Sequence, residues 1–276
     1  MESTTFPSKC MICDESNCLT YINETLKILT CAKCNVIYNE HEFTEKIFEN
    51  KVFPKPPLLK LLFHKLTHVR ISQNIADEYV KYLKSKTKMN FKNVLEIGAY
   101  YGCLVNNLNK LGIEAHGIES DQQFIEFAVT KNIQQGHFDK NYVLNEKYDL
   151  ICLTQMIYFM RDNYAILKHV KSMLNPNGCV FISTRRGKLK EFSSFKGNKR
   201  ENISTNMILS KKNYESICNK LGLEVIDNTF YTSELGKNKS NLIRNKLSYL
   251  QFIFNLKRQT HPDKDGDLSF ILLKNS

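Results

Sequence analysis

Residues 93–121, NVLEIGAYYGCLVNNLNKLGIEAHGIESD, decide the fold of this chain. The stretch opens with a short apolar run, residues 94–97, which is typical of a buried strand. A break with two glycines follows at 98–102, and apolar residues then recur at helical spacing over 103–110. Gly112 is placed to end that helix as a C-terminal cap. The stretch therefore predicts a strand, a tight turn and a helix in immediate succession.

The carboxylate of Glu119 follows a second apolar run, residues 115–118, and lies 21 residues after Gly98. A strand–turn–helix–strand unit that ends in an acid is typical of nucleotide-binding sheets. A dinucleotide site needs G-x-G-x-x-G, but Tyr100 and Cys103 stand at the second and third glycine positions. NAD and FAD are therefore disfavoured. A P-loop is excluded, because no Gly-Lys-Ser/Thr follows.

The motif E-x-G-x-x-x-G, followed by a carboxylate at the end of the next strand, resembles the first two motifs of the class I S-adenosylmethionine (SAM) methyltransferases. The resemblance implies that the turn passes under the methionine part of SAM and that Glu119 holds both ribose hydroxyls. Tyr100 departs from the family, which usually has a glycine there. For the turn taken alone, the alternative is an ordinary β–α connection with a chance acid. The residues that the resemblance places at SAM are Glu96, Gly98, Tyr100, Gly102, Glu119, Ser120, His137, Phe138 and Thr154.

The chain downstream continues the order of motifs in this family. A Tyr-Asp pair opens a predicted strand at 148–153, and LNPNGCVFIST (174–184) resembles the Leu-x-Pro-x-Gly turn and strand of the family. Further predicted elements are helices at 121–131 and 213–222, a helix whose last part is 167–174, a turn at 175–178, and strands at 132–135, 179–184, 223–228 and 268–274. The prediction is an α/β fold with a doubly wound, seven-stranded, Rossmann-like methyltransferase sheet.

The turn after the third strand of the family usually packs along the adenine edge. Phe138 would keep the apolar contact there. His137 stands where an acid is usual, which leaves Asp139 as an alternative partner for the adenine amino group.

Four cysteines near the N-terminus form the strongest local signal. They make two C-x2-C pairs separated by 17 residues, at Cys10, Cys13, Cys31 and Cys34, a spacing typical of a four-thiolate zinc site. Four thiolates fill the coordination sphere, so the zinc is expected to be structural. Ligand sets that use Cys18 or His41, and disulfides, are the less favoured alternatives.

The sequence divides into three predicted parts. Residues 1–50 are the zinc-ribbon module, 51–90 a linker with capping helices, and 91–276 the methyltransferase domain. One or two helices are predicted over 58–88, with Tyr79 on their common apolar face. The zinc module and the sheet are expected to have separate cores.

Composition sets the broad class of the chain. The 276 residues carry a formal charge of +11 and are 42% hydrophobic, which favours anionic partners and allows a sizeable core. No secretory signal or membrane span is visible, and nine cysteines favour metal or free thiols in a reducing compartment. We therefore expect a cytoplasmic protein.

Residues that follow the fourth and fifth predicted strands are the candidates for catalysis, because ligands bind outside the carboxyl ends of such strands. They are Tyr158, Gln155 and Arg185. The related ubiquinone-type and zinc-ribbon-bearing methyltransferases commonly carry a Glu-His pair where this chain has Tyr158–Phe159. Either Tyr158 or another residue handles the proton, or the acceptor needs little help, or activity is lost. Core packing is the alternative role of this aromatic pair.

Two arginines after the fifth strand, Arg185 and Arg186, indicate recognition of phosphate or carboxylate, since guanidinium groups bind these anions through two hydrogen bonds. A solvated charge run is the competing interpretation. Residues 241–257 read as a basic amphipathic helix that either contacts a membrane surface or roofs the acceptor pocket.

These features predict a SAM-dependent methyltransferase for a small or sugar-like, anionic acceptor, such as a nucleotide sugar or glycan precursor. An RNA methyltransferase is the less favoured alternative, because the Asn/Asp-Pro-Pro-aromatic loop and the Pro-Cys nucleophile are both missing. A degenerate SAM-binding protein is a third hypothesis. The expected cofactors are SAM and structural Zn²⁺.

Overall fold

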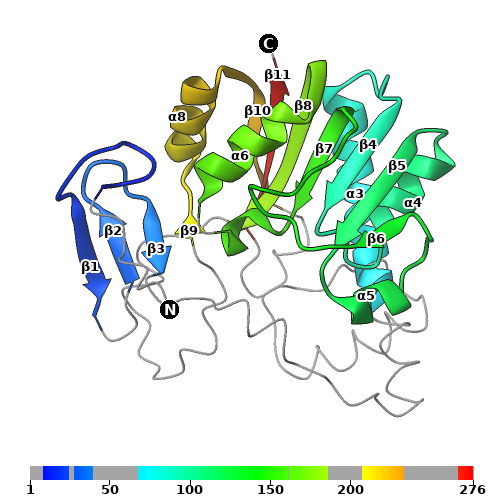
Figure 1. Ribbon diagram of the computed structural model, residues 1–276, viewed down its shortest axis with the longest axis horizontal. Helices are drawn as coiled ribbons and strands as arrows, with labels where there is room; N and C mark the ends of the chain where they lie inside the picture. Colours follow the sequence, from blue (N-terminus) through cyan, green and yellow to red (C-terminus); the bar gives the residue numbers. More distant parts are fainter. Residues whose placement is uncertain are drawn as a thin grey trace.

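The computed structural model describes residues 9–24, 28–39, 68–160, 162–185, 207–232 and 267–275 (Figure 1). These residues form a seven-stranded sheet and a separate four-stranded sheet. In spatial order, the larger sheet contains β10 (Leu223–Thr232), β11 (Asp267–Asn275), β8 (Leu174–Arg185), β7 (Tyr148–Thr154), β4 (Asn93–Ile97), β5 (Glu114–Glu119) and β6 (Ile133–Gln135). Of these strands, β11 alone runs antiparallel to its neighbours. The predicted seven-stranded, doubly wound sheet is confirmed.

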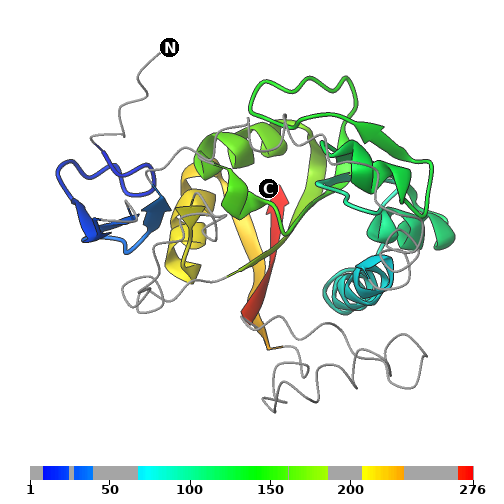
Figure 2. The same ribbon diagram turned by 90° about the horizontal axis from the view of Figure 1, so that it is seen from below.

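Helices cover both faces of the large sheet (Figure 2). One layer contains α3 (Arg70–Lys86), α4 (Cys103–Lys110) and α5 (Gln122–Glu126), and the other α6 (Asn163–Ser172) and α8 (Lys211–Leu221). Successive strand residues alternate between the layers: Val94, Leu150 and Phe181 pack toward α3 and α4, and Leu95, Ile151 and Ile182 toward α6 and α8. Alternation of two apolar sets explains why these strands read as continuous apolar runs.

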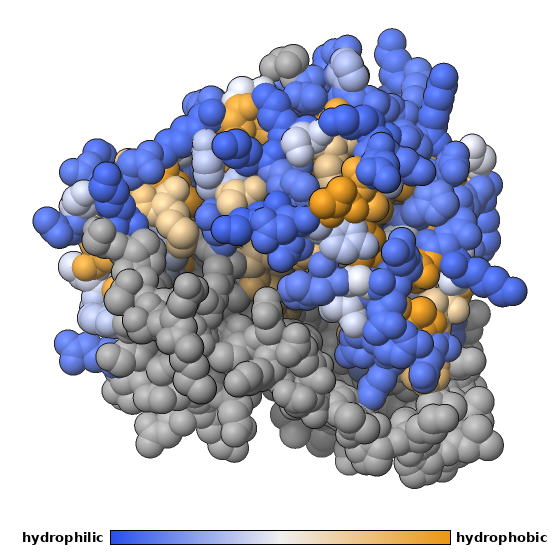
Figure 3. Space-filling view, in the orientation of Figure 1, coloured by the Kyte–Doolittle hydropathy of each residue, from blue (hydrophilic) through white to orange (hydrophobic). Residues whose placement is uncertain are grey.

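On the face in Figure 3, the described surface is mostly hydrophilic, and apolar residues form small, separate patches on it. No helix among the described residues is both long enough and apolar enough to span a bilayer.

The smaller sheet contains β1 (Leu19–Asn23), β2 (Ile28–Cys31), β3 (Ile37–Asn39) and β9 (Met207–Ile208). It is antiparallel and lies beside α8 (Figure 1). Its last strand, β9, comes from a part of the chain more than 160 residues after β3. The predicted division into 1–50, 51–90 and 91–276 stays a prediction, but the smaller sheet draws on residues beyond the first part.

The expectation of separate cores is wrong. Ile12 and Tyr38 of the N-terminal module belong to the same buried cluster as Leu209, Tyr214 and Ile217. A module of about 40 residues cannot bury enough apolar surface by itself, so it packs against α8.

Several predicted boundaries differ from the structure. The helix predicted to end at Leu174 ends at Ser172, because Leu174 already belongs to β8. The helix expected over 121–131 ends at Glu126, and the Val129 N–H then donates to the Tyr101 carbonyl at 2.9 Å. This hydrogen bond draws the chain away from the helix and toward the glycine turn. The turn predicted at 175–178 lies within β8 as an irregularity, where the pairing with β7 skips from Leu174 to Cys179.

Other elements match the sequence more closely. α3 includes Tyr79 on its buried face, whereas residues 58–67 of the predicted helical segment lie outside the described residues. β10 extends to Thr232, four residues beyond the predicted end, because it pairs along its whole length with β11.

Candidate functional site

The turn after β4 is built on two glycines in the left-handed region, Gly98 at φ +75° and Gly102 at φ +70°. The N–H groups of Gly98 and Ala99 both donate to the Ile118 carbonyl of β5, at 2.9 and 3.0 Å. A Cβ on Gly102 would lie 2.4 Å from Ile133 Cδ1, which is closer than any real contact. The position of the turn therefore depends on glycine at 102 through both backbone and space.

Tyr100, where the family usually has glycine, also adopts a left-handed conformation, at φ +53°. Its ring packs against Tyr101 and Phe124, with centroid separations of 3.9 and 4.2 Å. Its backbone N–H donates to Glu119 Oε2 at 2.8 Å. The aromatic contacts and this hydrogen bond hold a tyrosine in a conformation that a non-glycine residue rarely adopts.

Glu119 ends β5 with its carboxylate buried beneath the turn. One oxygen accepts from the Tyr100 N–H, and the other accepts from the Asp121 N–H at 2.9 Å and from the Ser120 hydroxyl at 3.4 Å. Burial raises the pKa of Glu119 above its ordinary value, although the backbone hydrogen bonds oppose that shift. A carboxylate has about four acceptor positions, and three are occupied here, so one position is open to a ribose hydroxyl. Displacement of the Ser120 hydroxyl, the longest of the three contacts, would free a second.

Glu96 is the second buried carboxyl group. Its Oε1 accepts from the Thr154 hydroxyl at 2.7 Å, whereas its buried Oε2 has no hydrogen-bond partner among the described residues. Burial raises the pKa of Glu96 to about 8, and the hydrogen bond from Thr154 opposes the shift. The Val105 N–H also favours the ionised form, although it does not reach hydrogen-bond geometry with Oε2. Buried polar atoms are rarely left unpaired, which indicates that this oxygen has a ligand or water partner in the working protein.

A chain of hydrogen bonds connects the loop after β7 with the sheet and α3. The Tyr158 hydroxyl donates to Gln155 Oε1 at 3.3 Å, and Gln155 Nε2 donates to the Ser183 hydroxyl at 2.9 Å. Ser183 Oγ and the Tyr79 hydroxyl are also 2.9 Å apart. Tyr158, Ser183 and Tyr79 are all buried, so the chain fixes this loop against β8 and α3.

The four predicted zinc ligands meet in one place. The Sγ atoms of Cys10, Cys13, Cys31 and Cys34 all lie within 4.8 Å of one another. Cys10 and Cys34 are 3.5 Å apart, and Cys13 and Cys31 are 3.6 Å apart. Zn–S bonds of about 2.3 Å in a tetrahedron give sulfur separations of about 3.8 Å, so the cluster fits zinc. Cys18 Sγ lies 3.3 Å from Cys31 Sγ, as a fifth thiol beside the cluster.

A family model described as a methyltransferase domain matches residues 67–228, which is more than half of the chain. The chain belongs to this methyltransferase family. The match covers the glycine turn, both buried carboxyl groups and the loop after β7. It ends within β10.

Relatives and solved structures agree with this assignment. The chain is 27% identical over 111 residues to a ubiquinone biosynthesis O-methyltransferase of Shewanella sp. (strain ANA-3), covering 37% of this chain and 47% of that protein. The chain thus spans about half the length of the curated relatives that it matches. Two solved structures have the same fold. A SAM-dependent methyltransferase from Archaeoglobus fulgidus has a TM-score of 0.51 at 16% identity, over 73% of this chain and 93% of that one. The plantazolicin methyltransferase, in complex with SAH, has a TM-score of 0.50 at 16% identity, over 84% and 93%.

The structure places the other predicted cofactor residues of this methyltransferase less favourably. Phe138 is buried, but its ring packs against Tyr142 and His169, each at a centroid separation of 5.6 Å. His137 is exposed, and the Asp139 carboxylate accepts from the Asn141 N–H at 2.7 Å. Their assignment to adenine stays a prediction.

The structure describes only some of the residues that were predicted to lie on the acceptor side. Arg185 is the last residue of β8, at the carboxyl edge of the sheet. Arg186 and residues 241–257 lie outside the described residues. Sequence reasoning missed Ser183. It could have been suspected because it lies two residues after Phe181 in the same strand and therefore on the same face, which α3 covers.

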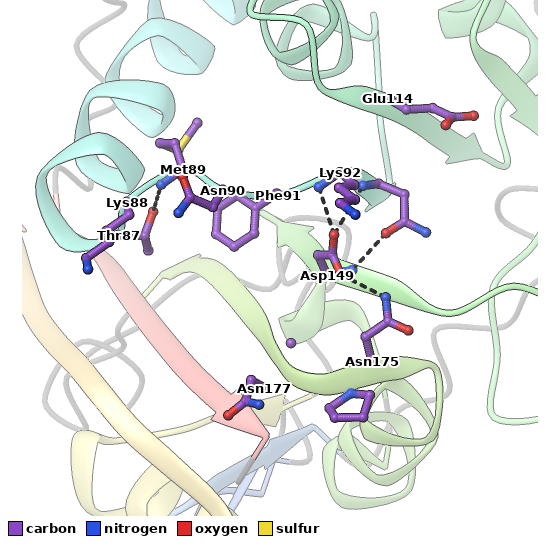
Figure 4. A pocket seen from close by; sticks show the side chains of 13 residues that line it. Thr87, Lys88, Met89, Asn90, Phe91, Lys92, Glu114, Asp149, Asn175 and Asn177 are labelled. Carbon is purple, nitrogen blue, oxygen red and sulfur yellow. Dashed lines mark hydrogen bonds between the residues drawn. The ribbon is translucent and has the colours of Figure 1, made fainter.

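A cavity of about 660 Å³ lies at the opposite edge of the methyltransferase sheet, where β4, β7 and β8 begin (Figure 4). Its polar centre is Asp149, which accepts from the Lys92 N–H and from Asn175 Nδ2, both at 2.7 Å. These contacts fasten three strands together. Because ligands of doubly wound sheets bind at the carboxyl ends of the strands, we assign this cavity no part in catalysis.

Proposed function

We propose that this chain is a SAM-dependent methyltransferase that binds SAM over the turn 98–102 and methylates an oxygen atom of a small anionic acceptor. The observation that carries the proposal is the left-handed glycine turn between two buried carboxyl groups, one of which has an unpaired oxygen. The family match and the fold shared with a SAM-dependent methyltransferase support it.

The two buried carboxyl groups would bind different parts of the ligand. Glu119 would accept hydrogen bonds from the ribose hydroxyls, because its oxygens are fixed at the end of β5 by backbone N–H groups. Glu96 would receive a cationic or N–H donor through its unpaired oxygen. SAM, when bound, supplies an electrophilic methyl group on a sulfonium. The chain's main contribution to the rate is to align the acceptor with that methyl.

The acceptor would lie beyond the ends of β7 and β8. Gln155, which donates to Ser183, and Tyr158, which donates to Gln155, follow β7 and would orient the acceptor. The Gln155 amide would not carry a proton. During transfer the acceptor oxygen–methyl bond forms, the sulfur–methyl bond breaks with its electron pair on sulfur, and the hydroxyl proton passes to water. The names of the relatives, which are O-methyltransferases, support an oxygen acceptor.

The acceptor class can be tested with SAM carrying a labelled methyl group and fractionated cell extract. We expect label in the small-molecule or glycan-precursor fraction. Label in RNA would overturn the small-acceptor proposal. SAM binding without transfer to any fraction would support a degenerate SAM-binding protein instead.

The anionic nature of the acceptor can be tested at Arg185. Lysine keeps the charge but cannot form the two-hydrogen-bond contact of a guanidinium. With the labelled fraction as substrate, Arg185→Lys should lower kcat/KM about tenfold, which corresponds to about 1.4 kcal/mol. SAM affinity serves as the control and should not change. Unaltered acceptor kinetics would remove Arg185 from the site.

We also propose that Cys10, Cys13, Cys31 and Cys34 hold one structural zinc ion, because their sulfur atoms have the separations of a tetrahedral site. Elemental analysis of protein purified under reducing conditions should find one zinc per chain. Zinc-free, folded protein would contradict this.

A further inference from the structure

Two short turns of the N-terminal module, residues 10–13 and 31–34, carry the four cysteines and are called the two knuckles here. Both are hydrogen-bonded to α8. In the first knuckle, the Ile12 carbonyl accepts from Lys220 Nζ at 2.7 Å. The same ammonium also pairs with Asp14, just after the knuckle.

The second knuckle is attached at the other end of the helix. The Cys34 carbonyl accepts from Asn213 Nδ2 at 2.9 Å. Asn213 is buried and also caps α8, because its Oδ1 accepts from the Ser210 N–H at 2.7 Å. A single side chain therefore joins the N-terminus of α8 to a knuckle.

A third connection runs through the smaller sheet. Tyr38 of β3 lies with its hydroxyl 3.2 Å from Cys10 Sγ and pairs in the sheet with Met207 of β9. β9 in turn contacts the short 3-10 helix η2 (Ile157–Phe159), and Leu209 shares the buried cluster of Ile157. The elements next to the cysteines thus reach the acceptor-side loop that carries Tyr158.

We propose that the metal-held knuckles are a positioning device for the acceptor side of the methyltransferase. By fixing both ends of α8 and the partner strand of β9, the ion sets where η2 lies. Ala99 and Tyr101 of the turn under SAM belong to the other buried cluster, with α3 and α4, so we expect the turn to keep its position when the ion is removed. The inference rests on the proposed zinc site and gives the N-terminal module a role in the proposed reaction.

Hydrogen exchange on the full chain, with zinc bound and after chelation under reducing conditions, tests this directly. Chelation should speed amide exchange at least about tenfold over residues 207–221 and, to a smaller extent, over 155–160. Exchange over residues 93–119 should not change. Unchanged exchange at 207–221 after confirmed zinc loss, or an equal rise over 93–119, would overturn the proposal.

Zinc release from intact variants gives a second measurement that involves neither SAM nor acceptor. Asn213→Asp keeps the helix-capping oxygen but removes the donor to Cys34, and Lys220→Met removes the donor to Ile12 while keeping the aliphatic stem. Lys212→Met, at an exposed position of the same helix, is the matched control. Both test variants should release zinc to a chromophoric chelator at least about fivefold faster than the control.

Release at the control rate in both variants would contradict the coupling of the knuckles to α8. SAM affinity, measured on the same samples, separates this failure from a failure of the proposed function. Loss of coupling with intact SAM binding would leave the methyltransferase proposal standing.

Discussion

The two buried carboxyl groups of the site differ in how their oxygens are satisfied. Glu119 accepts backbone N–H donors on both oxygens, so its position is fixed before any ligand arrives. Glu96 uses only one oxygen and keeps the other buried and unpaired. We interpret the first as a preorganised anchor and the second as a group whose charge depends on the ligand.

Glu96 leads to a prediction about pH. Its pKa of about 8 lies above the value of about 4.3 for an exposed glutamate, so the folded chain holds a proton that the unfolded chain loses. The contribution of this group to stability is therefore complete below about pH 4.3 and is lost as pH rises through about 8. A cationic ligand at the unpaired oxygen should lower this pKa and release the proton.

We expect SAM binding at pH 7 to release close to one more proton in the wild type than in Glu96→Gln. Calorimetry in two buffers with different ionisation enthalpies measures this difference, and the comparison cancels the titration of SAM itself. Equal proton release in the two proteins would mean that Glu96 does not respond to the cofactor.

Gly102 leads to a prediction about stability. Gly102→Ala places a Cβ at positive φ and 2.4 Å from Ile133 Cδ1, whereas Gly112→Ala has a similar φ of +79° and nothing within 4 Å. Gly112→Ala should therefore cost only backbone strain, about 1–2 kcal/mol. Gly102→Ala should cost about 2 kcal/mol more in urea unfolding, because it adds overlap. Equal losses would show that the turn relaxes freely.

Sequence could predict some of these residues and not others. Gly98, Gly102 and Glu119 belong to one short stretch, where spacing alone brings them together. The contact of Ser183 with Tyr79 joins residues 104 positions apart, and its geometry depends on how α3 packs on the sheet. No local pattern contains that information.

At the level of helices and strands, Ser183 connects β8 with α3 and with the loop after β7. Its substitution should therefore weaken the contacts among all three. Ser183→Ala removes the hydroxyl that Gln155 Nε2 and the buried Tyr79 hydroxyl both contact, and we expect a loss of about 2 kcal/mol. Tyr79→Phe removes only one hydroxyl and should cost about 1 kcal/mol. Urea unfolding measures both. Ser172→Ala, at an exposed position of α6, is the control and should stay within about 0.5 kcal/mol.

The order of these losses is what matters. Tyr79→Phe costing more than Ser183→Ala would show that the serine is not the centre of the hydrogen-bond chain.

Element boundaries were predictable where apolar periodicity alone decided them. β4, α4 and β7 lie where their apolar residues indicated, to within a residue. α5 is shorter than its periodicity suggested, because a hydrogen bond from Val129 to the Tyr101 carbonyl competes with the helix. Pairing with β11 also extends β10 beyond its predicted end, and the residues of β10 alone do not indicate this extension.

At the scale of the whole molecule, the N-terminal module and the large sheet share a buried cluster. The C-x2-C spacing predicted the metal cluster, but it could not predict β9, whose pairing with β3 depends on two residues far along the chain. The succession of strands and helices along the chain was predictable because the motifs of the family occur in the same order along this sequence. The docking of the module on α8 was not, since it depends on Asn213 and Lys220, which look like ordinary helix residues.

The turn after β4 and the acid at the end of β5 are together the proposed binding site for SAM. Calorimetric titration of SAM into wild-type protein, Glu119→Ala and Glu114→Ala tests it most directly, since Glu114 is an exposed acid of the same strand. Loss of charge-assisted hydrogen bonds of about 1.5–3 kcal/mol should weaken SAM binding at least about tenfold in Glu119→Ala. Glu114→Ala should bind as the wild type does. Wild-type affinity in a folded Glu119→Ala would contradict the account.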